Sequence, residues 1–248
     1  MDVVYALGGG MGHRMRAGAL ARRLGGAAHI LHQAPREPDA APATRLPPGA
    51  SPGWVRSWLR DALGHSGRLF VDTFPAGVAR ELGDAVLSAA RRTVLIQRHL
   101  RTEQYDDYFA LAGRFDERWL PYPPALCAWE GEVGGVHVGP LVRSLPVAAG
   151  PRAPLAVIGD AARLPPGWRA LLPTGTRWVD GFFDVLPPAE RYLCVGAGHN
   201  LCWELIGAGA AARHLPLPRR YDDQHRRALR LGRAALRRED VEVFLAAQ

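Results

Sequence analysis

Two polar residues in the last quarter of the chain, Asn200 and Glu204, are spaced as neighbours on one face of a helix. They follow an apolar run over 192–195 and a glycine turn over 196–198, a pattern that predicts a buried strand, a sharp turn and a helix start. The first turn of a helix presents N–H groups and a positive dipole end to phosphate, and a carboxylate one turn later can accept bonds from two vicinal hydroxyls. The pattern predicts a nucleotide diphosphate site, with Asn200 as the helix cap.

The surroundings of Glu204 favour a ligand role for its carboxylate. The helix predicted over 201–207 is apolar on nearly all sides, so a charge within it needs a partner; the alternative role is stabilising the helix dipole. After the next strand, which ends near 215–218, Asp223 and Gln224 open another helix. Because parallel strands place successive helix starts over the same sheet edge, we expect Asp223 and Gln224 at the edge that carries Glu204.

A second glycine-rich turn, GGGMGH over 8–13, lies between an apolar run over 3–7 and a helical pattern over 14–24. It differs from the G-x-G-x-x-G fingerprint of dinucleotide-binding folds. Whether the fingerprint is counted from the first or from the third glycine of the turn, its last glycine position holds another residue. The next strand ends at Gln33 without the acid that holds ribose in nicotinamide enzymes. The turn therefore disfavours a nicotinamide cofactor.

Strand and helix patterns alternate along the whole chain. Further strands are predicted over 28–32, 69–71, 93–97, 118–120, 136–138, 155–158 and 177–179, and further helices over 54–63, 78–90, 103–115, 168–172, 222–233 and 241–246. This alternation predicts an α/β fold with parallel sheets, helices on both faces and ligands at the carboxyl ends of the strands. A Pro-rich stretch over 35–52 predicts a surface loop.

A second Pro-rich segment, over 146–154, is the predicted linker between two domains. It separates an amino-terminal domain over 1–150 from a smaller carboxyl-terminal domain over 151–248. The hydrophobic content of 48% in 248 residues is sufficient for packed cores.

The net charge of +7 does not by itself indicate nucleic acid. The chain contains no lysine, so every strong base is an arginine, and the arginine-rich run over 226–238 has no interleaved aromatic residues. We interpret that run as the solvated face of the closing helices. Single arginines such as Arg98, Arg101 and Arg219 could bind phosphate or an anionic acceptor, but a solvated surface is the better interpretation of each.

The three cysteines show no C-x-x-C spacing and are predicted to be buried free thiols in a reducing compartment. The sequence shows no signal-peptide pattern and no apolar run near the ~20 residues of a membrane span. We therefore expect a cytoplasmic protein, for which peripheral membrane contact stays open and no oligomeric state is predicted.

Both ends of the chain resemble the GT-B glycosyltransferases, specifically MurG-like enzymes and UDP-glycosyltransferases. Residues 8–13 are similar to the amino-terminal Gly-Gly-x-Gly-Gly-His loop of that group. The residues at positions of its carboxyl-terminal donor signature are Gly198, Asn200, Glu204, Gly209, Pro216, Asp223 and Gln224. The similarity covers about the first thirty and the last sixty residues, and the middle matches as alternation.

The resemblance implies two Rossmann-like domains with parallel sheets facing a cleft. It implies transfer of a sugar from a nucleotide diphosphate donor, first of all a UDP-sugar, to an acceptor hydroxyl without a metal or other cofactor. Glu204 would bind the ribose, residues 198–200 the diphosphate through backbone N–H groups, and Asp223 with Gln224 the sugar. The implied donor-binding residues are Gly10, Gly12, Gly198, His199, Asn200, Glu204, Asp223 and Gln224. Residues 178–181 fall where such enzymes contact the base.

His13 is the catalytic candidate that the resemblance implies, as the general base for the acceptor hydroxyl or as a residue that orients the acceptor. Asp72, at the carboxyl end of a predicted strand, is the candidate for the acid that orients His13. The alternatives are a capping or surface histidine and a turn-forming aspartate. Inversion at the anomeric carbon is favoured, because a single base suffices for direct displacement.

Two positions depart from the plant-type enzymes: Gly196 stands where they carry His, and Leu201 where they carry Ser or Thr. The carboxyl-terminal domain is also shorter by about one strand and helix. These departures keep alternatives open: a nucleotide-sugar hydrolase, a 2-epimerase, or a non-catalytic binding or partner protein.

Overall fold

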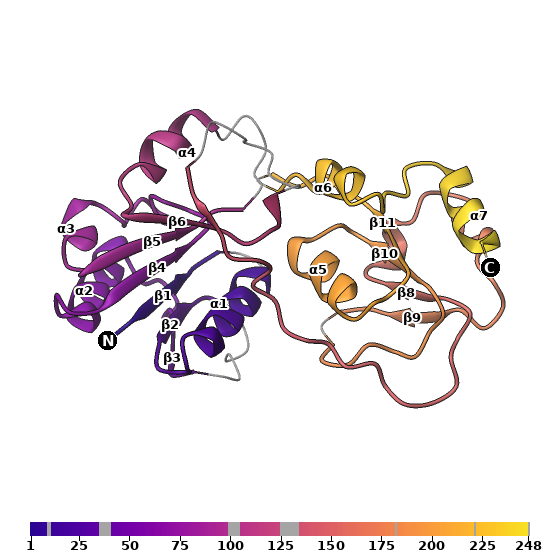
Figure 1. Cartoon of the computed structure of the whole chain (residues 1–248), viewed down its shortest axis with the longest axis horizontal. Helices are drawn as coiled ribbons and strands as arrows, with labels where there is room; N and C mark the ends of the chain where they lie inside the picture. Colours follow the sequence, from indigo (N-terminus) through magenta and orange to yellow (C-terminus); the bar gives the residue numbers. More distant parts are fainter. Residues whose placement is uncertain are drawn as a thin grey trace. The chain divides into compact units, whose positions relative to one another are not determined.

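The computed structural model describes residues 1–8, 11–34, 41–98, 105–124, 134–181, 183–220 and 222–247. The chain divides into two units, Met1–Arg143 and Ser144–Gln248 (Figure 1). The segment over 146–154, predicted as a linker, belongs to the second unit. Within it Val147 pairs with Leu186 and Ala153 with Ala189 in isolated parallel bridges.

The first unit is built on a seven-stranded sheet in the order β3-β2-β1-β4-β5-β6-β7, and its neighbouring strands are parallel. The strands are β1 (Val3–Ala6), β2 (His29–His32), β3 (Ala43–Arg45), β4 (Arg68–Asp72), β5 (Arg92–Ile96), β6 (Glu117–Leu120) and β7 (Val136–His137). The strand order reverses between β1 and β4. In open α/β sheets ligands bind outside the carboxyl ends of the strands at such a switch point.

Both faces of the central strands β1, β4 and β5 are buried, which explains why each contains a continuous apolar run. The helices of the unit are α1 (Met11–Arg23), α2 (Pro52–Leu63), α3 (Asp84–Leu87) and α4 (Tyr105–Ala112). Ala17 and Leu20 of α1 pack on one face, against Val4 and Phe70. Tyr5 points to the other face and is also fully buried.

Two predictions for this unit are wrong. The helix expected over 78–90 is reduced to α3, because Glu81 turns inward to accept hydrogen bonds from the Tyr5 hydroxyl and from Ala79 N at 2.7 Å. The loop expected over 35–52 contains the edge strand β3, which pairs with β2; residues 35–40 lie outside the described part. The three-residue strand β3 is too short to show a period in the sequence.

The second unit contains a four-stranded parallel sheet in the order β11-β10-β8-β9. Its elements are β8 (Ala156–Ile158), η3 (Ala161–Arg163), η4 (Trp168–Leu171), β9 (Arg177–Val179), β10 (Tyr192–Val195), α5 (His199–Gly207), β11 (Ala212–Leu215), α6 (Gln224–Arg230) and α7 (Arg238–Ala246). Apolar clusters cover both faces of this sheet. The helix predicted over 168–172 is the 3-10 turn η4.

The predicted α/β class with parallel sheets is confirmed in both units. Within the described residues, every helix is too short or too polar to cross a membrane. Cys194 and Cys202 are buried free thiols, as expected, whereas Cys127 lies outside the described residues.

Candidate functional site

The structure brings His13 and Asp72 together at the carboxyl edge of the first sheet. The helix α1 begins at Met11, so Gly12 and His13 belong to its first turn and not to the preceding loop as predicted. Asp72 is the last residue of β4. His13 Nδ1 lies 2.7 Å from Asp72 Oδ2, and both side chains are buried. The first turn of α1 and the end of β4 thus supply one buried pair at the switch point.

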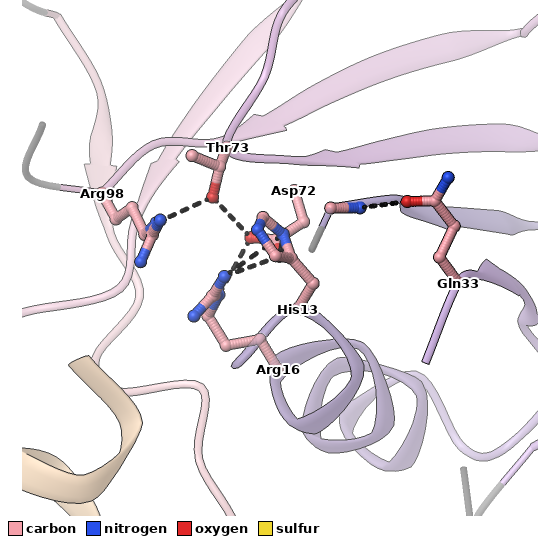
Figure 2. Close-up of polar contacts among 7 residues, drawn as sticks. His13, Arg16, Gln33, Asp72, Thr73 and Arg98 are labelled. Atoms are coloured by element: carbon pink, nitrogen blue, oxygen red, sulfur yellow. Dashed lines mark hydrogen bonds and ion pairs between the residues drawn. The ribbon is translucent and has the colours of Figure 1, made fainter. Parts of the chain in front are cut away.

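Two residues that the sequence did not single out complete this cluster around Asp72 (Figure 2). Arg16 donates from Nε to Asp72 Oδ1 at 2.9 Å and from Nη2 to Oδ2 at 2.8 Å. The Thr73 hydroxyl donates to Oδ1 at 3.1 Å and accepts from Arg98 Nε at 3.0 Å. Since Arg16 follows His13 by three positions on α1, helical spacing could have identified it.

The charges in the cluster define the protonation of His13. Burial raises the pKa of Asp72, but Arg16 and His13 outweigh burial and hold that pKa well below its ordinary range. Burial lowers the pKa of His13; Asp72 opposes this change, while Arg16 and Arg98 add to it. An ionised carboxylate only accepts, so the proton of neutral His13 lies on Nδ1 and the lone pair on Nε2. The 3.5 Å contact between Arg16 Nη2 and His13 Nδ1 joins two donors and is not a hydrogen bond.

The His13 ring is held between Phe74 and the backbone of Gly8. Its centroid lies 5.5 Å from that of Phe74, with the rings 27° apart. Gly8 has φ 155, and a Cβ atom there would come within 2.5 Å of His13 Nε2. Gly8 N also donates to Gln33 Oε1 at 3.2 Å (Figure 2). Only glycine leaves room for this ring position; Gly10 of the same loop lies outside the described residues.

In the second unit, the predicted diphosphate site is the turn between β10 and α5. The helix begins at His199 with Gly198 as its N-cap, and no side chain caps it. The prediction that Asn200 caps the helix is wrong, because Asn200 lies within the first turn. His199, Asn200 and Glu204 are all buried, and the ring centroids of His199 and Trp203 lie 6.3 Å apart with the rings inclined by 65°. Asn200 and Glu204 are one helical turn apart, as expected.

Three buried side chains bind the backbone of this turn. Gln224 Oε1 accepts from Ala197 N at 2.8 Å and from Leu217 N at 3.0 Å. Arg227 Nη1 donates to Ala197 O at 2.6 Å, and His214 Nδ1 lies 3.3 Å from Gly196 O. These contacts fix the path of the chain immediately before α5.

These contacts also show where Asp223 and Gln224 lie. Asp223 caps α6 by accepting from Arg226 N at 3.0 Å. Gln224 contacts the turn before α5, so the starts of α5 and α6 lie at the same edge of the sheet, as predicted. The interpretation of residues 226–238 as a solvated face is wrong for Arg227, which is buried and paired with Asp222 at 2.5 Å. Its spacing of three residues from Gln224 on α6 was the available signal.

Trp178, in the segment expected to contact the base, lies on β9 with 45% of its surface exposed. The Arg169 guanidinium lies 5.6 Å from its ring centroid. Among the described residues, no group of three His, Cys, Asp or Glu side chains could hold a metal ion.

No protein-family model matches the chain. No curated protein sequence matches it either. Among solved structures, the chain is similar to a UDP-glucosyltransferase from Polygonum tinctorium, which is described as capable of glucosylating indoxyl and was determined in complex with 3,4-dichloroaniline. The similarity covers 88% of this chain and 80% of that one, with a TM-score of 0.55 and 14% identity. At this identity the likeness supports the fold, a Rossmann-like α/β fold of the kind found in a glycosyltransferase.

Proposed function

We propose that the chain is a GT-B glycosyltransferase that transfers a sugar from a nucleotide diphosphate sugar, first of all a UDP-sugar, to an acceptor hydroxyl. The observation that carries the proposal is the buried His13–Asp72 pair at the switch point of the first sheet. The similarity in fold to a UDP-glucosyltransferase supports it. The resemblance to MurG-like enzymes rests on the sequence motifs alone.

In this proposal the unit Met1–Arg143 performs the proton transfer. His13 Nε2 takes the proton of the acceptor hydroxyl while the acceptor oxygen forms a bond to the anomeric carbon. The bond between that carbon and the diphosphate oxygen breaks, and its electron pair leaves with the nucleotide diphosphate. Asp72 keeps the imidazole oriented through Nδ1 and stabilises the imidazolium that forms. Displacement in a single step inverts the anomeric carbon.

The unit Ser144–Gln248 binds the donor. The N-terminus of α5 presents backbone N–H groups to the diphosphate, which stabilises the charge of the leaving group without a metal. Glu204, one turn further along α5, binds the ribose hydroxyls, and Asp223 with Gln224 lies near the sugar. The resemblance also implies donor contacts for Gly10 and Gly12.

The test is mass spectrometry of the purified chain with UDP-sugars and a panel of hydroxyl acceptors. We expect a glycosylated acceptor and UDP in equal amounts. Free sugar or an epimerised donor without acceptor would establish a hydrolase or an epimerase instead. Absence of binding to every nucleotide sugar in the panel would contradict the proposed transferase and favour a non-catalytic partner protein.

The donor assignment is tested separately by thermal unfolding with UDP. The wild-type chain should gain stability according to the concentration of UDP relative to its Kd. The Glu204→Gln variant should lose most of this gain, because the amide carries no charge and offers one acceptor oxygen where the carboxylate offers two. Equal protection of the two proteins would remove Glu204 from the donor site.

A further inference from the structure

The Asp72 carboxylate is shared among more donors than the orientation of a histidine requires. Arg16 occupies both of its oxygens, through Nε on Oδ1 and Nη2 on Oδ2. The hydroxyl of Thr73 binds Oδ1, so His13 shares Oδ2 with the guanidinium. The Arg16 side chain is 2% exposed, so solvent does not screen this ion pair.

The groups that face His13 come from every element around it. Arg16 lies on its own helix, Asp72 at the end of β4, and Phe74 two residues beyond Asp72. Arg98 follows β5 and acts on His13 by its charge, and Gly8 contributes only backbone. Among the described residues, one carboxylate and two guanidinium groups therefore act on the imidazole. A net positive charge in a buried site disfavours a protonated histidine.

We propose that Arg16 is a positioning residue that holds Asp72 with two hydrogen bonds and weakens His13 as a base. The role of Arg16 in sugar transfer rests on the proposed function, whereas the effect of Arg16 on His13 does not. Without Arg16, the full negative charge of Asp72 would act on the imidazole of His13 and stabilise its protonated form strongly. With Arg16, His13 stays unprotonated in acidic solution and releases its acquired proton readily after each transfer. The cost is a smaller driving force for deprotonating the acceptor.

The test is an NMR titration of the His13 imidazole, assigned by loss of its signal in His13→Ala. In the wild-type chain His13 should titrate below the ordinary value of about 6.5. In Arg16→Gln its midpoint should rise by about one to two pH units, because the nearest like charge is removed. In Arg16→Lys, which keeps the charge but not the two hydrogen bonds of the guanidinium, the midpoint of His13 should rise less. Arg22→Gln, an exposed position on the same helix, is the matched control and should leave the midpoint unchanged.

A second readout is the pH dependence of kcat/KM. Since the base acts when unprotonated, the acid limb of the kcat/KM profile should move to higher pH in Arg16→Gln by the same amount as the NMR midpoint. The KM for the donor should stay within about twofold of the wild-type value. A wild-type midpoint at or above about 6.5 overturns the inference even if Arg16→Gln fails to fold. An unchanged midpoint in folded Arg16→Gln also overturns it. A shifted midpoint in a chain without transferase activity would contradict the proposed function and leave the effect of Arg16 on His13 established.

Discussion

The two candidate sites of this chain are built from different kinds of contact. Around Asp72 in the first unit, side chains bind side chains: His13, Arg16 and Thr73 all meet one carboxylate. At the turn before α5 in the second unit, side chains bind backbone: Gln224 and Arg227 hold Ala197 by its N–H and its carbonyl. One arrangement controls charge and the other controls shape.

This difference separates two tasks of a transfer reaction. A buried network of ionisable side chains sets which atom carries a proton, so a single substitution changes the chemistry of the site. A backbone turn held by neutral and charged side chains sets where N–H groups point, so substitution there changes ligand affinity through geometry. We therefore expect the first site to govern turnover and the second to govern donor binding.

The largest expected effect comes from His13→Ala. Removing the base should lower kcat by about 10²-fold to 10⁴-fold, while UDP still protects the chain against thermal unfolding. Steady-state kinetics and thermal shift measure the two effects on the same preparation. His65→Asn, an exposed histidine with φ 60, is the control, because asparagine tolerates that backbone conformation. If His13→Ala keeps the wild-type kcat, the first site does not govern turnover and the expected difference between the two sites is wrong.

A smaller effect is expected from Arg227→Met in the second unit. The substitution removes the Arg227 hydrogen bonds to Asp222 and to the carbonyl of Ala197, so the free energy of unfolding should fall by about 2–4 kcal/mol. The Kd for UDP should rise, and kcat at saturating donor should fall less than tenfold. Urea unfolding and UDP titration measure these quantities. The control is Arg230→Met, at an exposed position on the same helix. A loss of kcat as large as in His13→Ala would show that the turn takes part in the chemistry.

The smallest effect is expected from Thr73→Ser. Thr73 has φ 77, a conformation that a β-branched residue adopts with strain. Serine keeps the hydroxyl that bridges Asp72 and Arg98 and removes the branch, so the free energy of unfolding should rise by about 1 kcal/mol or less. Thr73→Val keeps the branch and loses the hydroxyl, and it should be less stable than the wild-type chain. If Thr73→Val unfolds at the same temperature as the wild-type chain, the hydroxyl bridge contributes nothing to the stability of the first site.

Buried parallel strands were the part of the fold that sequence patterns predicted well. The apolar run over 192–195 coincides with β10 (Tyr192–Val195), because a strand covered on both faces carries apolar side chains at every position. The helix expected over 78–90 failed for a tertiary reason. Glu81 contacts Tyr5, which is 76 residues away in sequence, and no local pattern encodes that contact.

The part of the candidate sites that was predictable from the sequence is the set of residues whose place in the chain brings them near the end of a strand. Asp72 and His13 follow the ends of strands, and parallel topology brings such residues to one edge. The contribution of Arg16 could have been inferred from its helical spacing. The spacing of Arg227 from Gln224 could likewise have indicated that the two side chains share a face of α6. The backbone atoms that they contact in the turn before α5 could not have been inferred, because these contacts depend on where distant backbone atoms come to lie.

The pairing of His13 with Asp72 also determines when the site comes into existence during folding. The two residues are 59 positions apart, and β2, β3 and α2 lie between their elements in the chain. Contacts between distant segments of a parallel sheet form slowly compared with helices. A partly folded chain with α1 formed but β4 undocked has the histidine without its carboxylate. The proposed capacity for proton transfer therefore depends on the completed sheet, and the return of activity on refolding should report the docking of β4 beside β1.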